Sequence, residues 1–290
     1  MSDLSPNELR VLVAVAEEQS FTRAGARLGM TQSAVSHAVR GSERKLGAVL
    51  FERGRQGARA TDAGLRASTQ ARHILRLLDS MGSETRGAAE RTVTGTVRIA
   101  AFRSAAAGLL PEVLDRLAAL HPGLHPQVSI VRDVGRGSAG EVLDANADLG
   151  ITTVPPTSTV PDGLIFNRLY EERYLLAAPA KAADPRRLPL LDWSENCSSY
   201  TRRWWTEQDW LPERRIMVED DSVVLSMVAA GIGMAVMPHL TLAAPPEGVS
   251  VTDLGSTAPT RHLGYVTTPA LARTLPVRAL IRELRAAHAR

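Results

Sequence analysis

Cysteine is almost absent from this sequence. One cysteine, Cys197, occurs among 290 residues. This excludes an intramolecular disulfide and a zinc site built from several cysteines, and it agrees with a reducing compartment. The seven histidines show no metal-ligand spacing. We therefore expect no metal, no cofactor and no catalytic residue.

Long apolar runs are also missing. No stretch approaches the ~20 uninterrupted apolar residues of a membrane span, and the opening MSDLSPNELR lacks the apolar core of a signal peptide. We expect a cytoplasmic protein that does not bind membranes. With 44% hydrophobic residues, a chain of this length has enough apolar surface for about two or three globular domains.

Lysine is scarce, and the positive charge is unevenly placed. The net charge of +3 lies entirely in residues 1–90, because residues 91–290 hold equal numbers of acidic and basic side chains. Within residues 23–59, eight basic residues face two acidic ones. A basic footprint on a small region favours a polyanionic partner.

The first 60 residues show a helix-turn-helix pattern. Ser5, Pro6 and Glu8 predict the start of a first helix with a capping box. A short helix then ends at Gly29, and Thr31 is placed to cap the next helix. In that helix Ala34, Val35, Ala38, Val39 and Leu46 are predicted to face inward. Its polar side is predicted to comprise Gln32, Ser33, Ser36, His37 and Arg40.

Short polar side chains on one helix face suit contact with base edges and phosphates in a major groove. The alternative for the helix alone is a polar face that touches only water. After this helix, residues 48–64 predict two extended pieces around an arginine-rich tip, a hairpin wing whose Arg53, Arg55 and Arg59 would contact phosphate.

A long helix is predicted from Thr61 to about Ala89. Seven residues are spaced alternately four and three apart, which makes a heptad seam. They are Ala67, Ala71, Ile74, Leu78, Met81, Thr85 and Ala88. The seam favours dimerisation, with packing against the chain's own later domains as the alternative. Gly82 and Gly87 are expected to loosen the last turns and form a hinge.

Beyond residue 91 the pattern alternates strand and helix, which is typical of parallel α/β sheets. Strands are expected at 96–102, 127–134, 148–154, 164–179, 214–221 and 262–268, helices at 104–122, 138–147, 198–211 and 274–289, and a helix running into a strand over 222–238. Two such halves leave a cleft at the strand ends, where open sheets bind ligands.

These segments resemble the LysR-type transcriptional regulators along the whole chain. The likeness rests on FTRAGARLGMTQSAVSHAV, ERKLGAVLFERGRQGARATDAG, ADLGIT and VAAGIGMAVMP. It implies an α+β multidomain fold: a winged helix-turn-helix at 1–60 with its motif at 21–40, a linker helix at 61–90, and a periplasmic-binding-protein-like effector domain at 91–290. That domain would have two Rossmann-like subdomains, 91–161 plus 266–290, and 162–265.

The resemblance also implies partners: double-stranded DNA, a homodimer or homotetramer, a small effector and RNA polymerase. The residues expected to bind DNA are Thr31, Gln32, Ser33, Ser36, His37, Arg40, Arg53 and Arg55. The residues expected to bind the effector are Arg103, Ser104, Thr152, Thr153, Cys197, Ser198 and Ser199. Each effector residue has a plainer interpretation as a helix cap or turn, which is favoured for Arg103 and Thr153.

Two departures from the family pattern concern the helix after Thr31. Gly41 and Ser42 stand where members carry other residues, and glycine weakens a helix interior by roughly 1 kcal/mol. They bring into question where that helix ends. His37 replaces a longer donor, so base preference cannot be carried over.

Two hypotheses follow. In the first, the protein is a regulator that binds an interrupted palindrome and changes its spacing or bending of DNA when a small ligand closes the cleft. The ligand would be an anion if the helix beginning at Ser104 and the neighbouring Arg103 hold it. In the second, it is an α/β solute-binding or enzymatic protein whose first domain only oligomerises. A redox role for Cys197 would lack a resolving cysteine.

Overall fold

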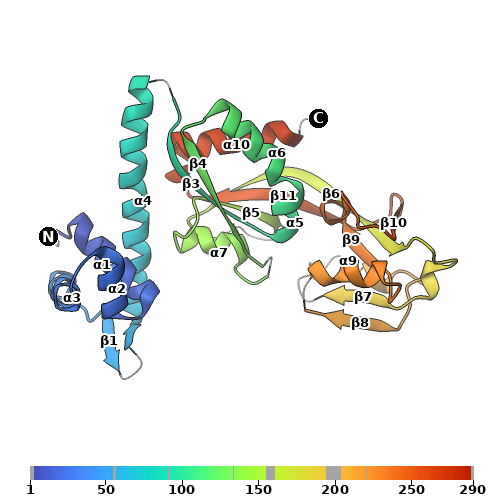
Figure 1. The fold of residues 1–290 in the computed structure, drawn as a ribbon, viewed down its shortest axis with the longest axis horizontal. Coiled ribbons are helices and arrows are strands. Elements are labelled where there is room, and N and C mark those ends of the chain that lie inside the picture. Colours follow the sequence, from blue (N-terminus) through green and yellow to red (C-terminus); the bar gives the residue numbers. More distant parts are fainter. Residues whose placement is uncertain are drawn as a thin grey trace. The chain divides into compact units, whose positions relative to one another are not determined.

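The structure is a computed structural model that describes residues 3–54, 57–90, 92–132, 134–154, 161–193, 204–219 and 221–288. It contains two compact units, coloured along the sequence in Figure 1. Unit 1 comprises Met1–Gly95 with Leu143–Asn146, and unit 2 comprises Thr96–Val142 with Ala147–Arg290. No helix among these described residues is long and apolar enough to cross a membrane.

Unit 1 combines helices with a β-hairpin. Its elements are α1 (Pro6–Glu18), α2 (Phe21–Leu28), α3 (Gln32–Leu46), β1 (Phe51–Gly54), β2 (Gly57–Ala60) and α4 (Asp62–Glu90). The hairpin is antiparallel, with Phe51 opposite Ala60. These are the elements that the sequence predicts for a helix-turn-helix, a wing and a long helix.

Local capping sets the helix starts. The Ser5 hydroxyl accepts from the Glu8 N–H at 3.3 Å, and the Glu8 carboxylate accepts from the Ser5 N–H at 2.8 Å. This is the predicted capping box, with Pro6 at the first helical position. Gly41 does not end α3, which continues to Leu46.

The core of unit 1 forms where α1, α2, α3 and the hairpin meet. Its buried members are Val11, Leu12, Ala14, Val15, Phe21, Ala24, Val35, Val39, Leu50, Phe51 and Ala58. The beginning of α4 joins them through Ala63 and Ala67. The helix is continuous through Gly82 and Gly87, and the hinge expected there stays a prediction.

Unit 2 is built on a seven-stranded sheet in the order β10-β6-β11-β5-β3-β4, with β9 also paired to β6. The strands are β3 (Gly95–Ala101), β4 (Leu124–Ile130), β5 (Leu149–Val154), β6 (Ile165–Pro179), β9 (Ala235–Pro238), β10 (Val249–Asp253) and β11 (Thr260–Thr267). A second, two-stranded sheet joins β7 (Leu190–Trp193) to β8 (Arg215–Val218) in parallel.

The large sheet is mixed, whereas the alternating pattern predicted a parallel one. Strands β3 and β5 are parallel, but β11 runs antiparallel to both β5 and β6. Strand β6 is a single 15-residue strand. It pairs with β11 through Arg173 and with β9 and β10 from Tyr174 onward, so it belongs to both halves of the unit.

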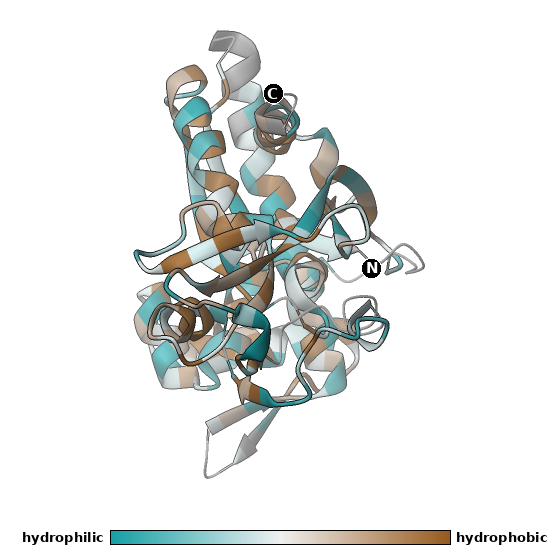
Figure 2. Ribbon diagram, turned by 90° about the vertical axis from the view of Figure 1, so that its right-hand side faces the viewer, coloured by the Kyte–Doolittle hydropathy of each residue, from teal (hydrophilic) through white to brown (hydrophobic). Residues whose placement is uncertain are grey.

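Helices cover the sheets. They are α5 (Arg103–Gly108), α6 (Leu110–Leu120), α7 (Gly137–Leu143), α9 (Asp221–Ala229) and α10 (Leu275–His288), with 3₁₀ turns η1 (Pro185–Arg187), η2 (His239–Leu242) and η3 (Leu271–Arg273). Hydrophilic and hydrophobic residues alternate along the helices (Figure 2), as expected of helices with one buried face.

The structure of unit 2 differs from the predictions at several elements, and one predicted helix lies partly outside the described residues. The single helix expected at 104–122 is two helices, broken at Leu109. Strands β7 and β10 were not predicted. Residues 198–203 of the helix expected at 198–211 lie outside the described residues; of the rest, 204–206 are helical, 207–211 are not, and Trp204 and Trp205 are buried.

Candidate nucleic-acid interface and ligand cleft

Helix α3 is the candidate recognition helix of unit 1, the helix that would enter the major groove of DNA. The Thr31 hydroxyl accepts from the Ala34 N–H at 3.2 Å, which confirms the predicted N-cap. Gly29 lies in the left-handed region with φ of 66° and ends α2, so the chain reverses in a tight turn. Thr31, Gln32, Ser33, His37 and Arg40 are all exposed.

The predicted face of α3 is wrong at three positions. Ser36 is only 4% exposed and belongs to the buried side, whereas Ala34 and Leu46 are exposed. The exposed stripe instead continues to Arg44. Ser33, His37, Arg40 and Arg44 are four, three and four residues apart, so they share one face of the helix.

The approach of α2 to the following turn depends on Gly25. A Cβ built there would lie 2.6 Å from the Met30 carbonyl oxygen, a distance that no side chain tolerates. Gly25 therefore lets the turn pass close to α2. The sequence contained this glycine, but the need for it appears only in three dimensions.

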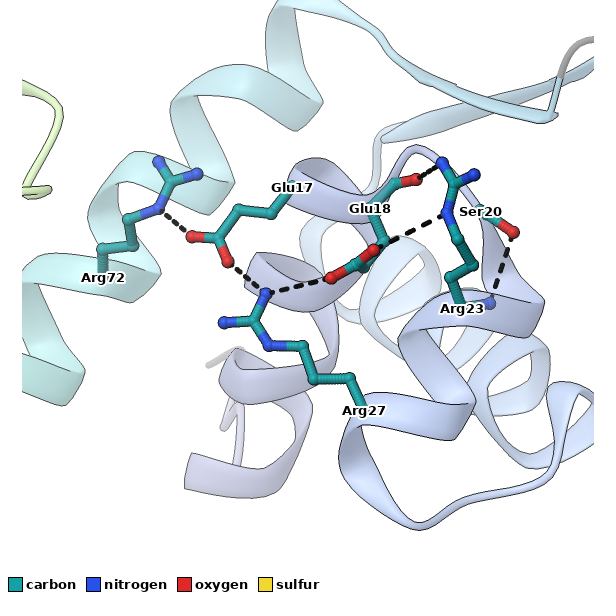
Figure 3. Close-up of polar contacts among 6 residues, drawn as sticks. All are labelled: Glu17, Glu18, Ser20, Arg23, Arg27 and Arg72. Carbon is teal, nitrogen blue, oxygen red and sulfur yellow. Dashed lines mark hydrogen bonds and ion pairs between the residues drawn. The ribbon is translucent and has the colours of Figure 1, made fainter.

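Ion pairs connect the end of α1 to α2 and to α4 (Figure 3). At the end of α1, the Glu17 carboxylate pairs with Arg27 of α2 at 2.5 Å and with Arg72 of α4 at 3.1 Å. The neighbouring Glu18 pairs with Arg23 at 3.6 Å. Because α3 follows α2 directly, this cluster helps to fix the direction in which α3 points.

A carboxylate links α3 to the wing. The Glu43 Oε1 atom accepts from the N–H groups of Leu50 and Phe51, at 2.9 and 3.3 Å. In the wing Arg59 is exposed. The side chain of Arg53 and the whole of Arg55 lie outside the described residues, so their predicted phosphate contacts stay predictions.

The structure separates two kinds of basic residue in the 23–59 footprint. Arg23, Arg27 and Lys45 pair with carboxylates of α1. The hydrogen bond with Glu17 raises the pKa of Arg27 above its ordinary value, and burial opposes this rise by a smaller amount. By contrast, Arg40, Arg44 and Arg59 form no ion pair within the described part of the chain, and these unpaired charges lie on α3 and the wing.

In unit 2 the described residues that were predicted to line a ligand cleft lie at the ends of β3 and β5, which are side by side. Ala101 of β3 pairs with Ile151 of β5, so Arg103, Ser104, Thr152 and Thr153 follow at the same edge. Ser104 lies in the first turn of a helix, as expected, although α5 begins one residue earlier, at Arg103, with Phe102 at the N-cap and no side-chain capping bond.

Arg103 and Ser104 both have protein partners. The Arg103 guanidinium lies 3.0 Å from the Asp221 carboxylate at the start of α9. Ser104 is 6% exposed, and its hydroxyl accepts from Arg261 at 3.2 Å. Thr152 is 9% exposed and donates to the Thr153 carbonyl. Cys197, Ser198 and Ser199 lie outside the described residues.

Sequence reasoning missed a buried ion pair beside this edge. Arg261 of β11 lies 2.6 Å from Glu172 of β6, and both side chains are at most 5% exposed. Glu172 also accepts from the Leu240 N–H in η2. The pair thereby joins both long strands to α5 and η2. The sequence did not single out these two residues, because β6 also carries Arg168, Glu171 and Arg173.

Helix α4 carries the last candidate surface. Ala71 of the predicted seam is buried, whereas Ile74, Leu78 and Met81 are 44%, 36% and 61% exposed. Leu77 beside them is 43% exposed. The seam therefore packs on its own unit at the beginning of the helix and presents apolar side chains beyond Ala71.

Comparison with known families gives two matches that together span nearly the whole chain. Residues 6–65 match the family described as "Bacterial regulatory helix-turn-helix protein, lysR family". Residues 90–289 match the family described as "LysR substrate binding domain". A curated relative, the probable HTH-type transcriptional regulator LrrA of Synechococcus elongatus, is 32% identical over 253 residues, with 83% of each chain covered.

Solved structures share the fold. Full-length CbnR in complex with its target DNA superposes with a TM-score of 0.69 at 20% identity, covering 98% of this chain and 100% of that one. LysG of Corynebacterium glutamicum with bound effector arginine superposes with a TM-score of 0.65 at 19% identity, covering 99% and 98%.

Proposed function

The chain belongs to the LysR family of transcriptional regulators, and from this premise we propose how it binds DNA and what it responds to. It recognises an interrupted palindromic promoter site as a homodimer or homotetramer, and a small effector in unit 2 alters that binding. The observation that carries this proposal is the exposed stripe of Ser33, His37, Arg40 and Arg44 on a capped helix.

The exposed side chains of α3 fall into two groups, according to whether they would contact base edges or phosphates. Gln32, Ser33 and His37 are exposed near the helix N-terminus and would contact base edges. Arg40 and Arg44, with Arg53, Arg55 and Arg59 of the wing, would contact phosphate. Thr31 would add a phosphate contact while it caps the helix. Ser36 is buried and leaves the proposed set.

Two copies would associate through α4. Apolar side chains exposed on a single copy gain free energy when a second copy covers them, at about 25 cal/mol per Å² of apolar area buried. The two recognition helices of such a dimer would contact two half-sites, and its two-fold symmetry would match a palindromic site. By family likeness we further propose contact with RNA polymerase, and no cofactor besides the effector.

The effector would bind at the edge formed by Ser104, Thr152 and Thr153, with Cys197, Ser198 and Ser199 facing it. An anionic effector would have to compete with the Asp221 carboxylate for Arg103, which now lies 3.0 Å away. Such competition would separate α5 from α9 and so connect ligand binding to the relation of the two halves of unit 2.

Fluorescence anisotropy with the upstream intergenic DNA, at several salt concentrations, tests the DNA-binding proposal. Gln32→Ala should weaken specific binding by about 1–3 kcal/mol if Gln32 contacts a base. Arg40→Ala should weaken binding to all duplexes and lower the salt slope by about one unit, because one phosphate contact is lost.

The matched controls are Gln70→Ala and Arg66→Ala, which remove the same side chains from exposed positions of α4. They should bind as the parent does. Equal affinity of the parent for random duplex and promoter DNA would contradict the proposal, as would unchanged binding by the two α3 variants.

A further inference from the structure

A pocket in unit 2 is lined by one side of α10, and none of its lining residues belongs to the edge that carries Ser104. Its floor comes from the two long strands, where Tyr265 of β11 is paired with Asn167 of β6. Paired residues on neighbouring strands point to the same face of a sheet, so the phenol and the amide lie together. Ile165 and Ala272 complete the floor of a pocket of about 420 Å³.

Three arginines of α10 line the same pocket. Arg278, Arg282 and Arg285 are four and three residues apart and therefore share one helix face, with Ile281 between them. All three are exposed at the pocket. No lining residue carries a carboxylate, which is an unusual charge arrangement on a chain with almost equal numbers of acidic and basic residues.

The three guanidiniums differ in what they already contact. Arg285 donates to the Tyr265 hydroxyl at 2.9 Å, so its charge is oriented but not neutralised. Arg282 pairs with Glu283 at 3.0 Å and donates to His121 at 2.7 Å. Arg278 forms no ion pair or side-chain hydrogen bond among the described residues.

The acidic partner of Arg282 is shared. Glu283 is 2% exposed and also pairs with Arg116 of α6 at 3.0 Å. Burial raises the pKa of Glu283, but the hydrogen bonds from Arg282 and Arg116 outweigh it, and the net shift is downward. One carboxylate thus serves two guanidiniums, and the pocket keeps a net positive charge.

We propose that this pocket binds a small oxyanion with at least two negative charges, such as a phosphoryl or polycarboxylate group. The planar fork of arginine suits bidentate contact with either group. Arg278 and Arg285 would hold the anion from two turns of α10, Asn167 would donate an amide hydrogen, and Ile165 and Ile281 would contact an apolar part of the ligand. The site is independent of the DNA-binding residues and of the effector edge.

Isothermal titration of the full chain, at constant ionic strength in chloride, tests the site with two probes, inorganic pyrophosphate and citrate. We expect saturable binding of at least one probe, and which one binds distinguishes phosphoryl from carboxylate chemistry. Arg278→Gln should weaken binding about tenfold, because one charge-assisted bidentate contact is lost. The affinity of Arg278→Lys should lie between those of the parent and Arg278→Gln, since lysine keeps the charge but lacks the planar fork of arginine.

Two controls separate this pocket from general attraction to a basic protein. Arg273→Gln removes an equal charge from an exposed neighbour that does not line the pocket, and Arg66→Gln removes one from an exposed position of α4. Both should bind the probes within about twofold of the parent, because screening at physiological salt limits long-range effects. The melting temperature of Arg278→Gln should match that of the parent, since the side chain has no partner to lose.

Three results would overturn the proposal: no saturable binding of either probe, equal weakening in Arg273→Gln and Arg278→Gln, or loss in Arg66→Gln with retention in Arg278→Gln. The last would assign the anion to unit 1. Tyr265→Phe gives an additional readout. It removes the hydroxyl that orients Arg285, so it should weaken binding by less than Arg278→Gln does, while the charge of the pocket stays the same.

Discussion

At the scale of single residues, Glu8 ties the start of α1 to α3. Its carboxylate accepts from the Lys45 ammonium at 2.7 Å and from the Ser5 N–H at 2.8 Å. The hydrogen bond from Lys45 contributes most to lowering the pKa of Glu8 below its ordinary value of 4.5. A lowered pKa in the folded chain means that the stabilisation is present above the unfolded pKa and is lost as pH falls through the folded one.

We therefore predict that Glu8→Gln flattens the decline in stability of unit 1 below about pH 4.5, where carboxylates of the unfolded chain begin to take up protons. At neutral pH the variant should lose less than about 1 kcal/mol, because Lys45 is partly exposed and such pairs are weak. Urea unfolding at a series of pH values measures both effects. An unchanged pH profile would contradict this role for Glu8.

Residue-level prediction succeeded where the signal was local. The caps at Ser5 and Thr31 and the turn at Gly29 depend on neighbours within three residues, and the sequence shows those directly. Ser36 failed because its burial depends on packing. Val35, Ser36, Val39 and Ser42 are all buried in α3, so the inward stripe is broader than the apolar residues alone indicate, and small hydroxyls fit within it.

At the scale of elements, the hairpin wing is attached to α3 by one side chain. Glu43→Ala should leave the N–H groups of Leu50 and Phe51 without their acceptor, which costs about 1–3 kcal/mol for a buried donor. Faster amide hydrogen exchange at these two residues would report the loss. Glu43→Gln keeps an acceptor oxygen and should retain most of the protection. Equal exchange in Glu43→Ala and the parent would contradict the attachment.

Element boundaries in unit 2 were harder to predict. The break between α5 and α6 has a signal in hindsight, because Pro111 suits the first turn of a new helix. The short strands β7 and β10 had none, since each has only four or five residues and is defined by its partner strand. The candidate effector edge was partly predictable. The ion pair of Arg103 with Asp221 was not, because Asp221 lies far along the chain and no local pattern connects the two residues.

At the scale of the whole molecule, α4 predicts an assembly. Leu78→Glu with Met81→Glu should convert a dimer into a monomer, because each places a charge among apolar side chains that a partner would cover. Analytical ultracentrifugation measures the mass. Glu84→Gln, a change at the polar surface of α4, serves as the control. A dimer that persists in the double variant would exclude this surface as the main contact.

The sequence also predicted the division of the chain into a basic helical part and an α/β part, because composition and periodicity change there. It did not predict the mixed sheet. Strand β11 enters between β5 and β6 from the end of the chain, and no local pattern specifies which strand a distant segment will pair with. The same limit concealed the Glu172–Arg261 pair, whose members are 89 residues apart.

The continuous strand β6 has a mechanical consequence. Its first part is hydrogen-bonded to β11 and its last part to β9 and β10. The two halves of unit 2 are therefore joined by a continuous strand rather than by a loop. Any change in their relative angle must twist that ribbon and strain its ladder. The restoring torque would return the halves to rest once a ligand departs, and resetting the sensor would then require no separate source of energy.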